Sequence, residues 1–428
     1  MNLSDPPAWP SIDSSFVTPL LQGALKPLEL AGRRLLPIVQ GGMGIGVSAH
    51  RLAGTVAACG GVGTLSSVDL RRHHPDLMEQ TTGLGMDQAA KDAIDAANLV
   101  AIDREIAAAR ALSGGRGLVA INIMRAVAAY ASQVKRSLEA GIDAIVVGAG
   151  LPLDLPDLAA DFPKTLLIPI LSDARGVQLV VKKWERKKRM PDAIVIEHPR
   201  LAGGHLGAAR VGDLNDPRFE FERVIPDTVA FLRSLGLERE IPVIAAGGIR
   251  SREDIARLQS LGAAGVQLGT PFAVTLEGDA SDEFKHVLAN AKPEDIVEFI
   301  SVAGLPARAV ATKWLKSYLK AEPKLQAVAH VKAHCTKAFD CLAQCGLRDG
   351  KQGWGQFCID NQLAAAMRGD TQKGLFFRGA GALPFGDQIR SVRDLVERLL
   401  VGTPGEQVTS GLFGHVTEQP GLEASAAA

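Results

Sequence analysis

Residues 194–207 read IVIEHPRLAGGHLG and combine a strand pattern with a ligand-binding pattern. The first three residues are apolar and β-branched, which predicts a short buried strand. The segment then runs into a glycine pair followed by His205. Because glycine has no Cβ, its backbone can lie close to a ligand, and the next side chain projects into the same space. We therefore expect a ligand site where this strand ends.

Seven similar apolar runs occur along the chain, at 36–39, 62–65, 118–123, 144–148, 166–171, 241–246 and 265–268. Helical patterns separate them, at 48–59, 127–140, near Pro156, at 174–187, at 226–235 and from Ser251 onward. We expect Ser48 to cap the first of these helices. Near-continuous apolar strands that alternate with helices are typical of a parallel sheet covered on both faces. Eight such units predict an α/β fold in which the sheet closes into a (β/α)8 barrel, or TIM barrel.

The pattern also suggests domain boundaries. Residues 1–30 are rich in proline and serine and predict a surface arm, and residues 31–308 hold the barrel. The segment at about 66–117 is too long for an ordinary connection, so we interpret it as an insertion after the second strand. Residues 309–415 predict a mainly helical extension that contains four cysteines and a lid, and residues 416–428 predict a disordered tail.

Composition excludes several classes of function. The chain has 47 lysines and arginines and 47 aspartates and glutamates, so no net charge attracts nucleic acid, and the basic run 182–189 is interpreted as a solvated helix face. No apolar run approaches the roughly 20 residues of a membrane-spanning helix. Five cysteines without a secretory leader favour a reducing compartment, and we expect a cytoplasmic protein. A small-molecule ligand is the remaining expectation.

The strand ends predict what this ligand carries. In a (β/α)8 barrel, backbone N–H groups after the seventh and eighth strands commonly bind phosphate, and Gly247, Gly248, Gly269 and Thr270 lie there. Residues 40–43 read QGGM after the first strand and predict a shelf for a planar ring. A phosphate at one end and an extended ring at the other indicate flavin mononucleotide (FMN).

Five ordered motifs carry a family resemblance. They are QGGMG at 40–44, NIM at 122–124, AGGH at 202–205, AGGI at 246–249 and QLGT at 267–270. Between about Leu35 and Arg308 the chain resembles the nitronate monooxygenase family. The resemblance implies that the flavin ring meets the shelf and receives hydrogen bonds from Asn122 and Gln267. The residues expected to bind the cofactor are Gly41, Gly42, Met43, Asn122, Ser172, Gly203, Gly204, Ala246, Gly247, Gly248, Gln267, Gly269 and Thr270, and no metal ligand is predicted.

The resemblance also implies a reaction. His205 would stand beside the reactive face of the ring, where an imidazole with an ordinary pKa near 6.5 can remove the α-proton of a nitroalkane or stabilise a nitronate. The implied activity is oxidation of alkyl nitronates, or of nitroalkanes, with O2 to carbonyl compounds and nitrite. Two alternatives stay open: an NAD(P)H-dependent FMN reductase acting on quinones or enoyl thioesters, and a barrel that binds a phosphorylated ligand without turnover. The Asp-Ala-Arg run at 173–175 departs from the pattern of the family's monooxygenases, and Arg175 in this run therefore leaves the reductase alternative open.

Several residues have two interpretations at this point. His73 and His74 lie in a polar segment and are expected to be solvated. The spacing of Cys335, Cys341, Cys345 and Cys358 matches neither a zinc ribbon nor a ferredoxin, so reduced structural thiols are expected. In the glycine-rich segment 373–382, Phe376 and Phe377 are candidates either to cover the ring or to belong to the core. The sequence leaves the oligomeric state open.

Overall fold

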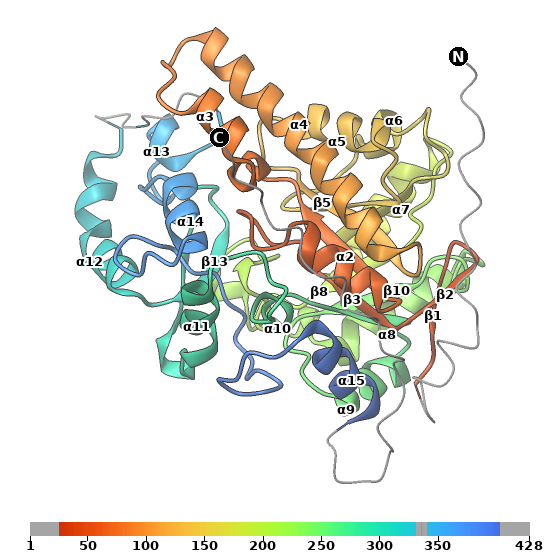
Figure 1. The fold of residues 1–428 in the computed structure, drawn as a ribbon. Helices are drawn as coiled ribbons and strands as arrows, with labels where there is room; N and C mark the ends of the chain where they lie inside the picture. The colour runs from red at the N-terminus through yellow and green to blue at the C-terminus, as the bar shows by residue number, and fades with distance from the viewer. Residues whose placement is uncertain (1–24, 331–334, 336–339, 403–428) are drawn as a thin grey trace, which may run out of the picture.

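The computed structural model describes residues 25–330, 335 and 340–402 and shows a closed eight-stranded parallel barrel (Figure 1). The strands follow one another around the barrel in chain order, and the last strand, β11, pairs with the first, β3, to close it. The prediction of a (β/α)8 barrel is therefore confirmed. The barrel strands are β3 (Ile38–Gln40), β4 (Val62–Ser66), β5 (Leu118–Met124), β6 (Ala144–Gly148), β7 (Leu166–Leu171), β8 (Ile194–Glu197), β10 (Val243–Ala246) and β11 (Gly265–Leu268).

Alternation along the strands builds two apolar layers. In β8, Val195 belongs to the cluster inside the barrel, whereas Ile194 and Ile196 belong to the larger cluster between strands and helices. Successive side chains of a strand point to opposite faces, so an all-apolar strand is buried on both sides. This double burial explains why the strands are apolar over most of their length.

Eight helices form the outer layer: α2 (His50–Ala58), α4 (Gln88–Ser113), α5 (Tyr130–Glu139), α6 (Leu155–Leu158), α7 (Ala174–Glu185), α8 (Phe221–Ser234), α9 (Arg252–Ser260) and α15 (Val392–Val401). The last helix corrects the predicted boundary at 308, because α15 packs against α9 and α2 and completes the eighth β/α unit (Figure 1). Similarly, α4 packs against α2 and α5 as a barrel helix, so only part of 66–117 is inserted.

Two helix starts also differ from the prediction. Ser48 does not cap α2; its Oγ accepts a hydrogen bond from Met43 N at 2.8 Å, and the N–H groups of Ala49 and Leu52 donate to the Asp279 carboxylate instead. A distant carboxylate thus replaces the local cap. Helix α8 begins at Phe221, with Pro226 inside it, because its buried apolar face extends before the proline.

The N-terminal region corrects a further boundary. Strands β1 (Leu28–Leu30) and β2 (Arg33–Leu35) form an antiparallel hairpin. Leu28, Leu30 and Leu35 are buried in the same cluster as the inward-facing barrel residues, so residues 28–30 close the barrel rather than lie on its surface. The predicted arm before residue 25 and the predicted tail at 416–428 lie outside the described residues.

The segment between β11 and α15 forms a side lobe next to the barrel (Figure 1). It contains α10 (Thr270–Ala273), α11 (Asp282–Asn290), β12 (Ile296–Ile300), β13 (Pro306–Val310), α12 (Lys313–Val328), α13 (Gly346–Asp349) and α14 (Ile359–Met367). Strand β13 pairs with β12 and with the short strand β9 (Gly204–His205) that follows β8. The lobe is therefore attached directly to the glycine–histidine segment. In the part of the chain that the structure describes, every helix is too short or too polar to cross a membrane.

Candidate active site

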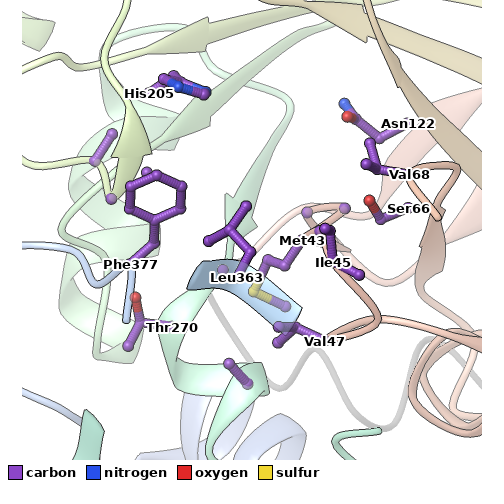
Figure 2. Close-up of a pocket in the computed structure, with 18 of the residues that line it drawn as sticks. Met43, Ile45, Val47, Ser66, Val68, Asn122, His205, Thr270, Leu363 and Phe377 are labelled. Atoms are coloured by element: carbon purple, nitrogen blue, oxygen red, sulfur yellow. The ribbon is translucent and has the colours of Figure 1, made fainter. Parts of the chain in front are cut away.

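A cavity of about 280 Å³ opens at the C-terminal ends of the barrel strands (Figure 2). Figure 2 shows His205, Phe377 and Thr270 on one side of it and Ser66, Val68 and Asn122 on the other. Twelve of the thirteen residues expected to bind the cofactor line this cavity, as does His205. The fold therefore brings together side chains and glycines from six strand ends, which only a closed barrel can place around one opening.

Ser172 is the exception among the expected residues. Ser172 does not line the cavity. Its side chain packs against Gly207 instead, where an added Cβ would lie only 1.8 Å from the Ser172 Oγ. Arg175 is exposed on α7, whose N-terminus is capped by the Asp173 carboxylate through Gly176 N at 2.7 Å. Arg175 is thus a solvent-facing residue at a helix start.

The predicted ring shelf is sterically tight. A Cβ added to Gly42 would lie 2.4 Å from the Asn122 Cβ, so glycine is required for the β3 loop to approach β5 this closely. The side-chain amides of Asn122 and Gln267 both line the cavity, and neither is hydrogen-bonded to a described residue. Two unpaired amides beside a glycine shelf can bond the heteroatoms of a flat heterocycle.

A glycine cradle lies beside this shelf, where a Cβ on Gly269 would be 3.6 Å from the Met43 Sδ. Gly247 and Gly248 have φ values of +112° and +72°, a region that L-residues rarely adopt. Gly269 precedes the N-terminus of α10, and the Thr270 Oγ accepts a hydrogen bond from Gly379 N at 3.0 Å. The glycines of two neighbouring strand ends, β10 and β11, meet here, and backbone N–H groups at these strand ends commonly bind phosphate in this architecture.

His205 is held by backbone pairing and is electrostatically isolated. Strand β9 aligns His205 with Ala307 of β13, and its ring lies beside Phe377 with centroids 5.5 Å apart. No described residue hydrogen-bonds its buried Nε2 atom. Burial lowers the pKa of His205 to about 4, so the imidazole is neutral at pH 7 and is a weak base. A neutral imidazole can still donate one hydrogen bond to an anion.

Glu197 is a further titratable residue of the cavity. It ends β8 and lines the cavity, and its carboxylate forms no ion pair or hydrogen bond with a described residue. Burial raises its pKa to about 7. The sequence carries a signal for this role, because an acidic residue that ends an apolar barrel strand lies on the face where active sites form. The next residue, His198, points elsewhere: its Nε2 lies 3.4 Å from the Glu220 carboxylate, and it does not line the cavity.

A C-terminal segment, residues 375–382, crosses the cavity and is called the strap below. The two candidate phenylalanines divide their roles in it. Phe376 is fully buried and stacks on Phe284 with centroids 5.5 Å apart, whereas Phe377 lines the cavity. Gly203 fixes the strap, because a Cβ there would lie 2.4 Å from Gly379 N. The strap therefore lies in backbone contact with the loop that carries His205.

The remaining candidates are structural. His73 is not solvated as expected, since its Nε2 lies 3.0 Å from Gly46 O, and His74 Nε2 lies 3.0 Å from the buried Glu105 carboxylate. Cys335, Cys341 and Cys345 of the lobe are free thiols, and burial raises the pKa of Cys341 and Cys345. Within the described ranges, no three His, Cys, Asp or Glu side chains are arranged to hold a metal ion.

Comparison with known proteins agrees with this arrangement. The sequence model described as nitronate monooxygenase matches residues 33–402. A Staphylococcus saprophyticus protein named "Probable nitronate monooxygenase" is 28% identical over 179 residues, which cover 42% of this chain and 46% of that protein. The matched part thus spans less than half the length of this relative.

Two solved structures share the fold. FabK from Thermotoga maritima has a TM-score of 0.59 at 22% identity and covers 90% of this chain and 94% of its own. Nitroalkane oxidase from Streptomyces ansochromogenes has a TM-score of 0.56 at 19% identity and covers 85% of this chain and 95% of its own. At these identities the likeness concerns the fold alone. The family match, which extends over most of the chain, shows that the protein belongs to the nitronate monooxygenase family.

Proposed function

We propose that this protein is an FMN-dependent nitronate monooxygenase that oxidises alkyl nitronates with O2 to carbonyl compounds and nitrite. The observation that carries this proposal is His205, an isolated neutral imidazole in the cavity of a chain of this family. Its substrates would be small molecules, and the proposal requires no second macromolecule.

The fit of the cavity to FMN supports the cofactor assignment. Gly41 and Gly42 would face the flat ring, the amides of Asn122 and Gln267 would bond its heteroatoms, and the glycine cradle would take the phosphate. Bound FMN would supply the centre that accepts electrons from the substrate and passes them to O2. The protein's own part is to bind, orient and shield the reactants.

The isolation of His205 favours nitronates over neutral nitroalkanes as substrates. A base with a pKa of about 4 removes a carbon-bound proton inefficiently near pH 7. A nitronate has already lost this proton, and it needs only a hydrogen-bond donor for its oxygen. Neutral His205 can be that donor, in a cavity where Phe377 excludes water from one side.

An anaerobic titration tests the proposal. The purified protein with FMN is mixed with an alkyl nitronate in one cuvette and with NAD(P)H in another, and flavin absorbance is followed. We expect bleaching by the nitronate, little by NAD(P)H, and nitrite after O2 is admitted. Bleaching by NAD(P)H alone would indicate a reductase of quinones or enoyl thioesters. A colourless protein that takes up no flavin would indicate a barrel that binds another phosphorylated ligand.

A further inference from the structure

Arg378 is a buried cation whose described partners are all neutral. Its side chain is 4% exposed. Nε donates to Leu288 O at 2.8 Å, and Nη1 donates to Gly379 O at 2.8 Å and to Gly381 O at 3.1 Å. All three acceptors are backbone carbonyls, and no carboxylate of a described residue forms an ion pair with Arg378. Burial lowers its pKa, yet a guanidinium stays protonated in proteins, so a positive charge lies here without a counter-charge.

Other buried arginines of the chain have carboxylate partners. Arg308 is 1% exposed and pairs with Glu298, and Arg71 is 5% exposed with its Nε 2.8 Å from Asp69. Burying an ion costs several kcal/mol in effective terms unless an opposite charge and hydrogen bonds compensate it. Arg378 differs from these two arginines because it has no carboxylate partner among the described residues. A missing negative charge is therefore expected near it.

The position of Arg378 indicates where that charge comes from. Arg378 lines the cavity, and it is the single lysine or arginine among the described residues that do so. It belongs to the strap at the point where Gly379 N bonds the Thr270 Oγ. Two residues further, a Cβ on Gly381 would lie 3.6 Å from the Gly248 Cα. The one lysine or arginine that lines the cavity in the described part of the chain thus lies next to the glycine cradle.

We propose that Arg378 supplies the counter-charge for the phosphate of the cofactor and closes the strap over it. This inference rests on the proposed FMN site. A phosphate monoester carries close to two negative charges at pH 7, and backbone N–H groups supply only partial positive charge. Arg378, in the strap, supplies the full positive charge. Because Nη1 also holds the carbonyls of Gly379 and Gly381, the same guanidinium that meets the phosphate orders the strap.

Comparing FMN with riboflavin, which has the same ring but no phosphate, tests this role. Dissociation constants are measured by flavin fluorescence for the wild-type protein and for Arg378→Gln and Arg378→Lys. Because a hydrogen bond to a charged group contributes more than a neutral one, we expect Arg378→Gln to weaken FMN binding by about 10- to 100-fold. Riboflavin affinity should change by less than about 3-fold, and Arg378→Lys should recover part of the loss for FMN.

Arg250 offers a matched control. It follows the cradle in sequence, is exposed and does not line the cavity, so Arg250→Gln removes one positive charge from the same region. A solvated charge is screened, and we expect it to change FMN affinity by less than about 3-fold. An equal effect of Arg250→Gln and Arg378→Gln on FMN binding would overturn the proposal, as would equal losses for FMN and riboflavin in Arg378→Gln.

If the variants do not fold, the FMN and riboflavin affinities of the wild-type protein still test the proposal. The proposal requires FMN to bind at least about 10-fold more tightly than riboflavin, since a charge-assisted contact is lost without the phosphate. Equal affinities would contradict the role of Arg378 and leave the flavin site itself intact. If neither flavin binds, the proposed function fails, which is a different result.

Discussion

The rings of His205 and Phe377 lie with their centroids 5.5 Å apart and their planes inclined by 59°. His205 follows barrel strand β8, whereas Phe377 belongs to the strap, which follows helix α14 of the side lobe. Backbone contacts between Gly203 and the strap hold the two segments together. One wall of the cavity therefore depends on a contact between segments that are far apart in sequence.

The two neighbouring phenylalanines should separate stability from binding. Phe376→Ala removes a fully buried ring and should lower the free energy of unfolding by about 3–5 kcal/mol. Phe377→Ala opens the cavity wall and should cost less than about 2 kcal/mol while raising the KM for nitronate. Denaturant unfolding and steady-state kinetics measure both. Equal losses of stability for the two variants would contradict the division of roles.

His205→Leu should lower kcat/KM for an alkyl nitronate by about 100-fold, because the hydrogen-bond donor to the developing charge is lost, whereas His205→Asn, whose amide can also donate, should lower it less. Flavin content should be retained, since the ring and phosphate contacts are made by other residues. Neutral nitroalkane should be a poor substrate for the wild-type protein already. Rapid wild-type oxidation of neutral nitroalkane that His205→Asn abolishes would instead identify His205 as a base.

The buried imidazole should also make the protein acid-sensitive. The pKa of His205 is about 4 in the folded protein and near 6.5 when unfolded, so below pH 6.5 the unfolded state binds more protons. Stability should fall as the pH drops from about 6.5 to about 4. His205→Asn should flatten this part of a curve of unfolding free energy against pH, and an unchanged slope would show that other groups cause it.

Glu197 should make stability depend on pH in the opposite direction, and Glu197→Gln tests this. The carboxyl has a pKa of about 7 when folded and near 4.5 when unfolded, so its stabilising contribution is present below pH 4.5 and is lost as the pH rises to 7. At pH 8 the glutamine variant should be more stable than the wild type, by on the order of 1–3 kcal/mol. At pH 4.5 the two should unfold alike, and a constant difference across this range would exclude titration of Glu197 as the cause.

Gly203→Ala should displace the strap, because the new Cβ would lie 2.4 Å from Gly379 N. We expect FMN affinity to fall at least about 10-fold with a barrel that stays folded, as judged by circular dichroism and flavin fluorescence. Gly212→Ala is the control, since nothing lies within 4 Å of its added Cβ. Retained affinity in Gly203→Ala would show that the strap does not help to form the site.

Local patterns predicted the barrel because they report burial directly. A strand buried on both faces must be apolar throughout, as at 194–196, and glycines at its end mark where backbone approaches backbone. The residues expected at the cavity follow from closure alone, since all parallel strands of a barrel end on one face. Ser172 was misplaced because a strand-end residue can also point toward the next loop, as its contact with Gly207 shows.

The sequence by itself determined the eight strands of the barrel, the glycine shelf and cradle, and the place of His205 at the cavity. Tertiary structure alone decided that α15 completes the barrel, that Phe377 rather than Phe376 lines the cavity, and that Arg378 lies at the cradle without a carboxylate. The physical reason is the distance along the chain over which each property is set. Periodicity and turn residues encode which faces are buried within one segment, whereas the pKa of His205 and the charge balance of Arg378 depend on contacts between distant segments.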